Sequence, residues 1–331
     1  MPLAPIERLP VELLQPIFLL SDYNLSLPLA SPNLAAKLSD DYIYNAVCTQ
    51  YLTTNLENRA WQTTAQSRIF ASRWMTWDYF KSWVLRKWGD KQCLCGKTPD
   101  EGCFDQQWPP NFEDATRMLF SRSHLPQLSY IKCRIPAKLL HGPWTTDKIQ
   151  FLRFLLWTVS VTVDWANPDI RRLAIEGKME AIREKNLEAV ELFNHNRRLG
   201  KAPNMDTVRF GVFEGGCDRS VMYDIMSTAR TWGMRGAQWK CEKLDAWCDE
   251  QIKNGNPKGK WLQLKLMELR AEYGSTGRKP AENEEPGVQC GWMHPKTGDY
   301  DDVEGDKLVI NVHRWSQVRF LEFRTARTYD W

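Results

Sequence analysis

The first fifty residues carry apolar side chains in three short groups, and each group has the spacing of a helix. In the first group, a proline that suits the first turn of a helix precedes four apolar residues: Pro10, Leu13, Leu14, Ile17 and Phe18. Pro16 should bend this helix or limit its length. Pro28 and Pro32 interrupt the second group, so we expect short helical turns over 25–38 and a third helix over 41–52.

A wide apolar stripe follows over 59–88, where large residues recur at three and four positions and predict one or two helices. The stripe consists of Trp61, Ala65, Ile69, Phe70, Trp74, Trp77, Phe80, Trp83, Val84 and Trp88. Five of the sixteen tryptophans of the chain lie in this segment. Because an indole buries a large area, we expect a buried aromatic core that seals the N-terminal helices against the rest of the protein. An aromatic ligand groove is the alternative.

Beyond this stripe the pattern predicts further short helices separated by polar breaks. We expect them over 111–122, 149–158, 168–185, 187–199, 206–214, 218–229 and 261–272. Residues 274–287 are rich in Gly, Pro and Glu and predict a loop, whereas 308–312 and 318–323 have the composition of a terminal β-hairpin. The expected fold class is therefore mainly α, with a β-hairpin at the C-terminal end.

Two stretches of the helical region, 171–193 and 207–222, share a layout. In each, a first helix with a small residue in its middle leads through a polar turn into a second helix. This layout resembles degenerate ankyrin repeats, although the Thr-Pro-Leu-His signature is absent, and a helical bundle is the alternative. In either arrangement the helix pairs cannot bury their apolar faces singly and have to stack on their neighbours.

Length and charge restrict the function classes. The 331 residues can form two or more domains, and the net charge of +3 comes from 44 basic and 41 acidic residues that are interspersed. Such a chain has no basic field for nucleic acid. The longest apolar run, 154–163, is half of the ~20 residues that cross a bilayer, and charges and prolines interrupt the region where a signal peptide is apolar. We therefore expect an intracellular protein, in the cytoplasm or the nucleus, that binds neither nucleic acid nor a membrane.

The nine cysteines are scattered along the chain, which is typical of free thiols in a reducing compartment. One cluster has the character of a metal site, formed by Cys93, Cys95 and Cys103 with Cys133 or His124. A structural zinc site sets one C-x2-4-C pair against a second pair, whereas here the first spacing is C-x-C and a matching pair is absent. We therefore favour ordinary thiols over zinc and expect no cofactor.

Catalytic motifs are missing from the sequence. The five histidines are far apart, and neither a G-x-S-x-G nor an H-E-x-x-H motif occurs. The acidic run over 299–306 lacks the glycine and the glutamate of a calcium-binding loop. Arg197 and Arg198, like the arginines over 314–327, are candidates for binding an acidic partner, although mixed charges nearby favour a solvated surface. An enzyme whose site combines the tryptophans with distant histidines stays a third hypothesis.

The order of residues over 9–44 is the most specific feature of the chain. A Leu-Pro start, an acidic residue, an Ile-Phe pair and a Leu-x-Leu-Ala-Ser block follow one another. This succession resembles the F-box, and its combination with a helical region is similar to fungal F-box proteins. A module of ~40 residues rarely buries a core alone, which fits a docking role. The residues that match the adaptor-facing positions of the family are Leu9, Pro10, Leu13, Leu14, Ile17, Phe18, Leu27, Leu29, Ala30 and Leu34.

The resemblance implies a non-catalytic receptor subunit of a cullin-RING ubiquitin ligase. Such a subunit binds a Skp-type adaptor, and through it a cullin, with the F-box, and it holds a protein substrate so that a ubiquitin-loaded enzyme reaches a lysine by proximity. The resemblance also implies a division of the chain into four parts. They are an F-box over 1–52, a Trp-rich connector over 53–135, a helical, ankyrin-like substrate-binding region over 136–272, and a linker with the hairpin over 273–331.

Two expectations separate this receptor from a helical scaffold whose N-terminal module packs internally. A receptor should expose apolar side chains within 9–18, because monomers rarely leave such a patch open without a partner. Leu14 and Phe18 are expected to be anchors of the interface, and truncating an anchor commonly costs ~2 kcal/mol or more of binding free energy.

Overall fold

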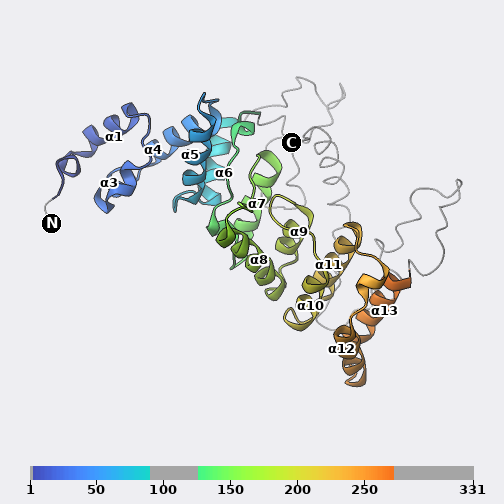
Figure 1. Ribbon diagram of the computed structural model, residues 1–331. Helices are drawn as coiled ribbons and strands as arrows, with labels where there is room; N and C mark the ends of the chain where they lie inside the picture. Colours follow the sequence, from blue (N-terminus) through green and yellow to red (C-terminus); the bar gives the residue numbers. More distant parts are fainter. Residues whose placement is uncertain (1–2, 90–125, 272–331) are drawn as a thin grey trace, which may run out of the picture. The chain divides into compact units, whose positions relative to one another are not determined.

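Helices dominate the computed structural model, which describes residues 3–89 and 126–271 (Figure 1). These residues form two compact units: the first holds 3–89, 126–140 and 145–171, and the second holds 141–144 and 172–271. The mainly α fold class is confirmed for them, and no regular strand occurs among them. The predicted helix over 111–122, the loop over 274–287 and the C-terminal hairpin lie outside the described residues, and the division into four parts stays a prediction.

The first unit begins with the short helices that the proline pattern predicts. They are a 3-10 turn over Pro5–Arg8, α1 over Val11–Leu20, α2 over Leu27–Ala30, α3 over Pro32–Lys37 and α4 over Asp41–Cys48. Pro10 is the cap residue directly before α1, and α1 continues for four residues beyond Pro16. Side-chain oxygens of Ser31 and Asp40 accept hydrogen bonds from the first turns of α3 and α4, which fixes where these helices begin.

The third helix is shorter than predicted because the chain widens into a π-type turn over Thr49–Thr53. The carbonyl group of Tyr51 lies in this turn and accepts hydrogen bonds from the side-chain amides of Gln62 at 3.0 Å and Gln66 at 2.9 Å. Both glutamines are buried on the next helix, α5 over Arg59–Ala71. Their side-chain amides replace the backbone donors that a regular helix would supply. The Tyr51 carbonyl is therefore hydrogen-bonded although the turn departs from helical geometry.

The tryptophan stripe divides between α5 and α6 over Trp77–Trp88 and forms an aromatic core. Trp77, Trp83 and Trp88 are buried, and Phe80 lies with its ring centroid 5.2 Å from that of Phe151 on α7, which spans Thr146–Thr158. The indole N–H of Trp77 donates to the Gln150 side chain at 2.9 Å. The expected aromatic core is therefore confirmed for Trp77, Trp83 and Trp88, whereas Trp61 is exposed over 43% of its surface and Trp74 is half-buried.

The first unit also pairs two extended segments. The amide of Ser160 donates to the carbonyl of Ile131 at 3.1 Å, and the amide of Thr162 donates to that of Cys133 at 3.2 Å. This parallel contact includes a single bridge between Arg134 and Thr162. It ties the segment after α7 to residues 29 positions earlier in the chain, as 160 minus 131 and 162 minus 133 show.

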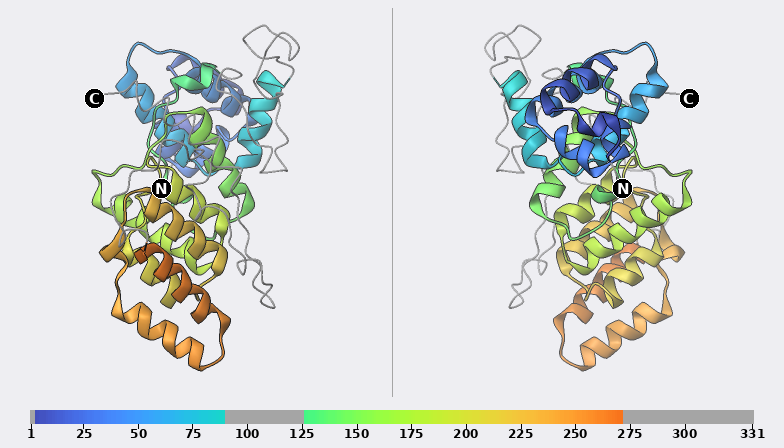
Figure 2. Two further views of the ribbon diagram at one scale, coloured as in Figure 1. Left: turned by 90° about the vertical axis from the view of Figure 1, so that its right-hand side faces the viewer. Right: turned by 90° about the vertical axis from the view of Figure 1, so that its left-hand side faces the viewer.

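The second unit consists of helices that follow one another through short loops. They are most of α8 over Pro168–Arg183, α9 over Leu187–His195, α10 over Met205–Phe213, α11 over Arg219–Thr231, α12 over Glu242–Lys253 and α13 over Pro257–Ala271. α9 ends four residues before the predicted end at Leu199. α12 was not predicted, because it buries only Leu244 and Cys248 and its apolar pattern is sparse. Figure 2 shows α12 and α13 side by side as an antiparallel pair.

A local turn recurs before two helices of this unit. Lys185 and Cys217 both adopt left-handed backbone conformations, with φ of 53° and 49°. Each precedes a capping residue, Asn186 for α9 and Asp218 for α11, whose side chain accepts a hydrogen bond from the amide three positions on. The two turns are 32 residues apart, as 217 minus 185 shows. α9 and α11 lie side by side, and α10 packs on α11.

Candidate functional site

Helix α1 carries two apolar stripes, and only one of them is buried. Leu14 and Phe18 are exposed over 0% and 1% of their surface, whereas Leu13, Ile17 and Leu20 are exposed over 54%, 42% and 86%. Side chains at intervals of three and four residues share a face of a helix, so the first pair points into the unit and the other three form an outward stripe. The expectation of exposed apolar residues within 9–18 is confirmed for Leu13 and Ile17.

Other apolar side chains of the same module are also exposed. They are Leu3, Val11, Leu29 and Tyr42. An exposed leucine by itself needs no explanation, but a helical stripe of three with further apolar residues on the same short module is typical of an interaction surface. We call the α1 stripe of Leu13, Ile17 and Leu20 the N-terminal docking face.

A lysine fixes the backbone at the N-terminal end of α1. The ammonium group of Lys37, in the last turn of α3, donates to the carbonyl oxygens of Glu7 and Leu9, both at 2.7 Å. The side chain of Asn33 donates to the Glu7 carbonyl as well, at 3.1 Å. These bonds fix the backbone directly before Pro10, and therefore the position at which α1 begins.

A tyrosine holds the other end of α1. Beyond the helix, Asp22 and Tyr23 adopt left-handed backbone conformations, and the hydroxyl of Tyr51 donates to the Asp22 carbonyl at 2.9 Å. Burial, with smaller contributions from Asp22 and Tyr23, raises the pKa of Tyr51 to about 12. The phenol therefore stays a neutral donor at physiological pH, and α1 is fastened at both ends.

The ten residues that match the F-box positions divide by burial. Pro10, Leu13, Ile17, Leu29 and Ala30 are exposed, Leu9 and Leu27 are half-buried, and Leu14, Phe18 and Leu34 are buried. The buried three stabilise the module, so the assignment of Leu14 and Phe18 as surface anchors does not fit their burial. Leu20 and Val11 belong to the exposed set although the sequence analysis did not single them out; Leu20 lies three positions after Ile17, which is the helical spacing that identifies it.

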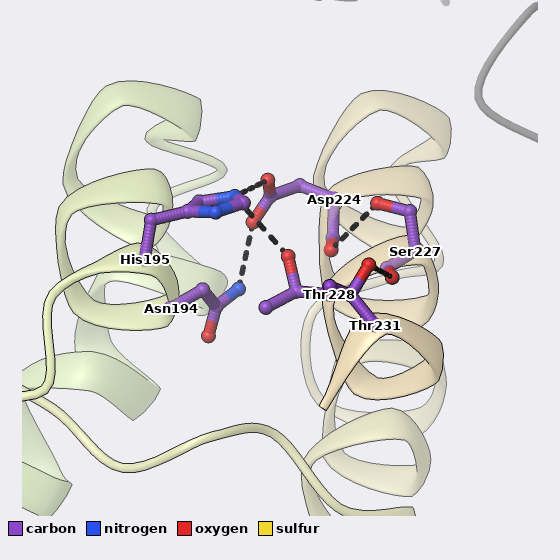
Figure 3. A network of polar contacts seen from close by, with 6 residues as sticks. All are labelled: Asn194, His195, Asp224, Ser227, Thr228 and Thr231. Atoms are coloured by element: carbon purple, nitrogen blue, oxygen red, sulfur yellow. Dashed lines mark hydrogen bonds and ion pairs between the residues drawn. The ribbon is translucent and has the colours of Figure 1, made fainter. Parts of the chain in front are cut away.

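A second site is a polar network between α9 and α11 (Figure 3). The Nε2 atom of His195 lies 2.7 Å from one carboxylate oxygen of Asp224, and the side-chain amide of Asn194 donates to the other oxygen at 2.7 Å. Thr228 places its hydroxyl 3.1 Å from the same Nε2 atom. Because Asp224 fixes the amide orientation of Asn194, the amide oxygen has to face away from it, and this buried oxygen has no hydrogen-bond partner among the described residues.

Lys178 of α8 adds a charge to this region. The lysine is buried, and its ammonium group donates to the carbonyl of Lys201 at 3.2 Å. Burial lowers the pKa of Lys178 to about 8, while the opposite charge of Asp224 offsets part of that decrease. Lys178 of α8 therefore interacts electrostatically with Asp224 of α11.

The network does not have the relay of a serine-type hydrolase. In such a relay one imidazole nitrogen faces the carboxylate and the other faces the hydroxyl that loses its proton. Here Asp224 and Thr228 both face Nε2. A proton on Nε2 satisfies the carboxylate and prevents the same nitrogen from accepting the threonine proton. The geometry of these residues is that of a structural clamp between two helices.

Metal chemistry finds no further support in the described part of the chain. Among residues 3–89 and 126–271, no group of three His, Cys, Asp or Glu side chains is placed to hold a metal ion. Cys93, Cys95, Cys103 and His124 lie outside the described residues. Burial raises the pKa of Cys133 to about 12, which keeps it a neutral thiol at physiological pH.

Comparison of the chain with protein-family models, with curated proteins and with solved structures gives no significant match in any of the three. None of the helices within the described residues is both long enough and apolar enough to span a membrane.

Proposed function

We propose that this chain is the substrate-recognition subunit of a Skp-cullin-F-box type ubiquitin ligase, located inside the cell. The observation that carries the proposal is the division of α1 into a buried stripe and an exposed stripe. The buried residues Leu14 and Phe18 order the helix, and the exposed residues Leu13, Ile17 and Leu20 offer apolar area to a partner. The resemblance of residues 9–44 to an F-box identifies the partner as a Skp-type adaptor.

The proposed role of the second unit is to hold the substrate. The recurrence of the same capped turn after 32 residues and the position of α9 beside α11 support stacked, ankyrin-like helix pairs, whose repeat is ~33 residues. Such stacks present extended surfaces to partner proteins. The subunit contributes no bond chemistry in this proposal; it raises the effective concentration of the substrate near a ubiquitin-loaded enzyme.

Co-purification with a Skp-type adaptor tests the proposal. Leu13→Ala combined with Ile17→Ala removes apolar area from the docking face and leaves the buried stripe intact. We expect adaptor recovery to fall roughly tenfold or more, because interface anchors commonly contribute ~2 kcal/mol or more. Leu264→Ala combined with Met267→Ala is the matched control, since these residues are equally exposed on α13 of the second unit.

Point variants suit this test better than deletion of residues 1–52. The deletion also removes Cys48, Tyr51 and Leu52, which are buried in the first unit. A wild-type chain that recovers no adaptor would contradict the proposal and leave the helical scaffold as the leading account. Equal adaptor recovery with the α1 double variant would contradict the docking face.

A further inference from the structure

Two segments of the second unit are basic and free of acidic residues. Residues 195–205 contain Arg197, Arg198 and Lys201, residues 225–241 contain Arg230, Arg235 and Lys240, and neither segment contains an Asp or Glu. The sequence alone suggested that mixed charges would surround Arg197 and Arg198. In the fold, the neighbour of Arg197 is the aromatic residue Trp232, because the two segments include the adjacent C-terminal parts of α9 and α11.

The ends of the two segments meet at an arginine and a tryptophan. The guanidinium carbon of Arg197 lies 3.9 Å from the ring centroid of Trp232, which corresponds to a planar stack. Both side chains are exposed, Trp232 over 37% of its surface. The polar network beneath them holds the end of α9 against α11, because Asp224 binds both Asn194 and His195. The stack is therefore placed by buried contacts and presented to solvent. We call Arg197 and Trp232 the stacked pair.

The local electrostatics favour an anion beside this pair. The carboxylate of Asp224 is engaged by His195 and Asn194, so it does not reach outward to Arg197. The last carbonyl groups of α11 carry partial negative charge, but the guanidinium of Arg235 donates to Arg230 and Met234 there, and backbone amides of the following turn pair with Thr228 and Ala229. The surface keeps a positive character at a place where a helix end is usually negative.

We propose that the stacked pair is the recognition site for an acidic peptide segment of a partner protein. A guanidinium that lies flat on an indole leaves its N–H edge available, and this edge matches a carboxylate bidentately. The indole offers an apolar surface to the neighbouring side chain of the peptide. The small net charge of the whole chain argues against a nucleic acid as the occupant. This inference rests on the proposed function for its biological meaning, since it names the chemical class of the substrate.

Binding of a fluorescein-labelled Glu-rich peptide to the full chain tests the proposal, with a Gln-rich peptide of the same length as the reference. We expect the Glu-rich peptide to bind more tightly, and its affinity to fall with added salt. Arg197→Met should weaken binding roughly tenfold or more, because it removes a charge-assisted hydrogen bond. Arg209→Met is the matched control, since the Arg209 side chain is 39% exposed and already paired with Asp206 at 2.8 Å.

Two further variants examine the stack itself. Trp232→Ala should weaken binding of the Glu-rich peptide although it changes no charge. Arg197→Lys keeps the charge but lacks the planar fork, so its affinity should lie below that of the wild type. Circular dichroism melting of each variant establishes that the second unit is folded. Equal affinity of wild type and Arg197→Met, or binding of oligothymidine without binding of the Glu-rich peptide, would overturn the proposal.

Adaptor co-purification on the same samples separates this inference from the proposed function. Arg197→Met should lose the peptide and keep the adaptor. Peptide binding through Arg197 in a chain that recovers no adaptor would refute the proposed function and leave the peptide site standing. Adaptor recovery in a wild-type chain that fails to bind the Glu-rich peptide would refute the peptide site alone.

Discussion

The N-terminal docking face and the stacked pair are supported by opposite kinds of chemistry. The docking face is apolar and exposed, and polar bonds from Lys37 and Tyr51 fasten the ends of the helix that carries it. The stacked pair is charged and aromatic, and a buried network around Asp224 fastens the helix beneath it. In both places, hydrogen bonds of less exposed residues hold the helix that carries the exposed side chains. Substitutions of the support and of the surface should therefore have different consequences.

The largest effect is expected where the docking face meets its core. Leu14→Ala combined with Phe18→Ala removes two fully buried side chains and should lower the free energy of unfolding by ~2–5 kcal/mol for each site. Leu13→Ala combined with Ile17→Ala should change it by less than ~1 kcal/mol, because surface truncations are usually within ~0.5 kcal/mol each. Urea unfolding followed by circular dichroism measures both. Equal destabilisation by the two double variants would refute the division of α1 into stripes.

An intermediate effect is expected in the polar network. Asp224→Ala leaves Asn194 and His195 without their carboxylate and should cost ~1–3 kcal/mol of unfolding free energy. Asp206→Ala is the control, because its ion pair with Arg209 is exposed and exposed pairs contribute ~0–1 kcal/mol. The same urea titration applies. If Asp206→Ala were as destabilising as Asp224→Ala, the network would have no special role as a clamp.

A pH-dependent effect is expected for Lys178. Its folded-state pKa is about 8, against 10.5 for an ordinary lysine. Below pH 8, Lys178 is protonated in both the folded and the unfolded chain, so the full cost of burying its charge lowers the free energy of unfolding. Between pH 8 and 10.5 the unfolded chain still holds the proton that the folded chain has lost, so stability rises with pH in this window. Relative to Lys178→Met, the wild type should therefore become more stable as the pH rises through this window.

Unfolding of both proteins at pH 7.5, 9 and 10.5 measures this change. A constant difference between wild type and Lys178→Met across the three pH values would show that the lysine titrates normally in the folded chain. Lys243→Met serves as the control variant, since Lys243 is exposed at the start of α12.

The sequence predicted those features that depend on neighbours in the chain. Helical spacing located α5, α6, α8 and α10 to within a few residues, and the prolines at 28 and 32 correctly divided α2 from α3. It could not tell which stripe of α1 faces inward, because Leu13 and Leu14 are both apolar and lie side by side on the helix. That choice depends on the residues that pack against α1, which are distant in sequence.

The second site was beyond sequence reasoning for a different reason. Asn194 and Asp224 are 30 residues apart and belong to no motif, and Arg197 and Trp232 are 35 residues apart. Only the alignment of α9 with α11 brings these pairs together. The basic character of these segments could nevertheless have been predicted, because the sequence itself shows that residues 225–241 contain no Asp or Glu. This composition supports an interaction of Arg197 with an acidic partner.

The bond between Trp77 and Gln150 has a consequence for the way this chain is made. Its two partners are 73 residues apart, so the aromatic core of the first unit stays incomplete while the ribosome adds the intervening segment. At ~5–20 residues per second this takes roughly 4–15 seconds. The N-terminal docking face leaves the ribosome before that interval begins, so each newly made chain presents an apolar helix and a half-formed core together. Molecular chaperones that bind apolar segments would therefore meet the docking face of the growing chain before the aromatic core of the first unit is complete.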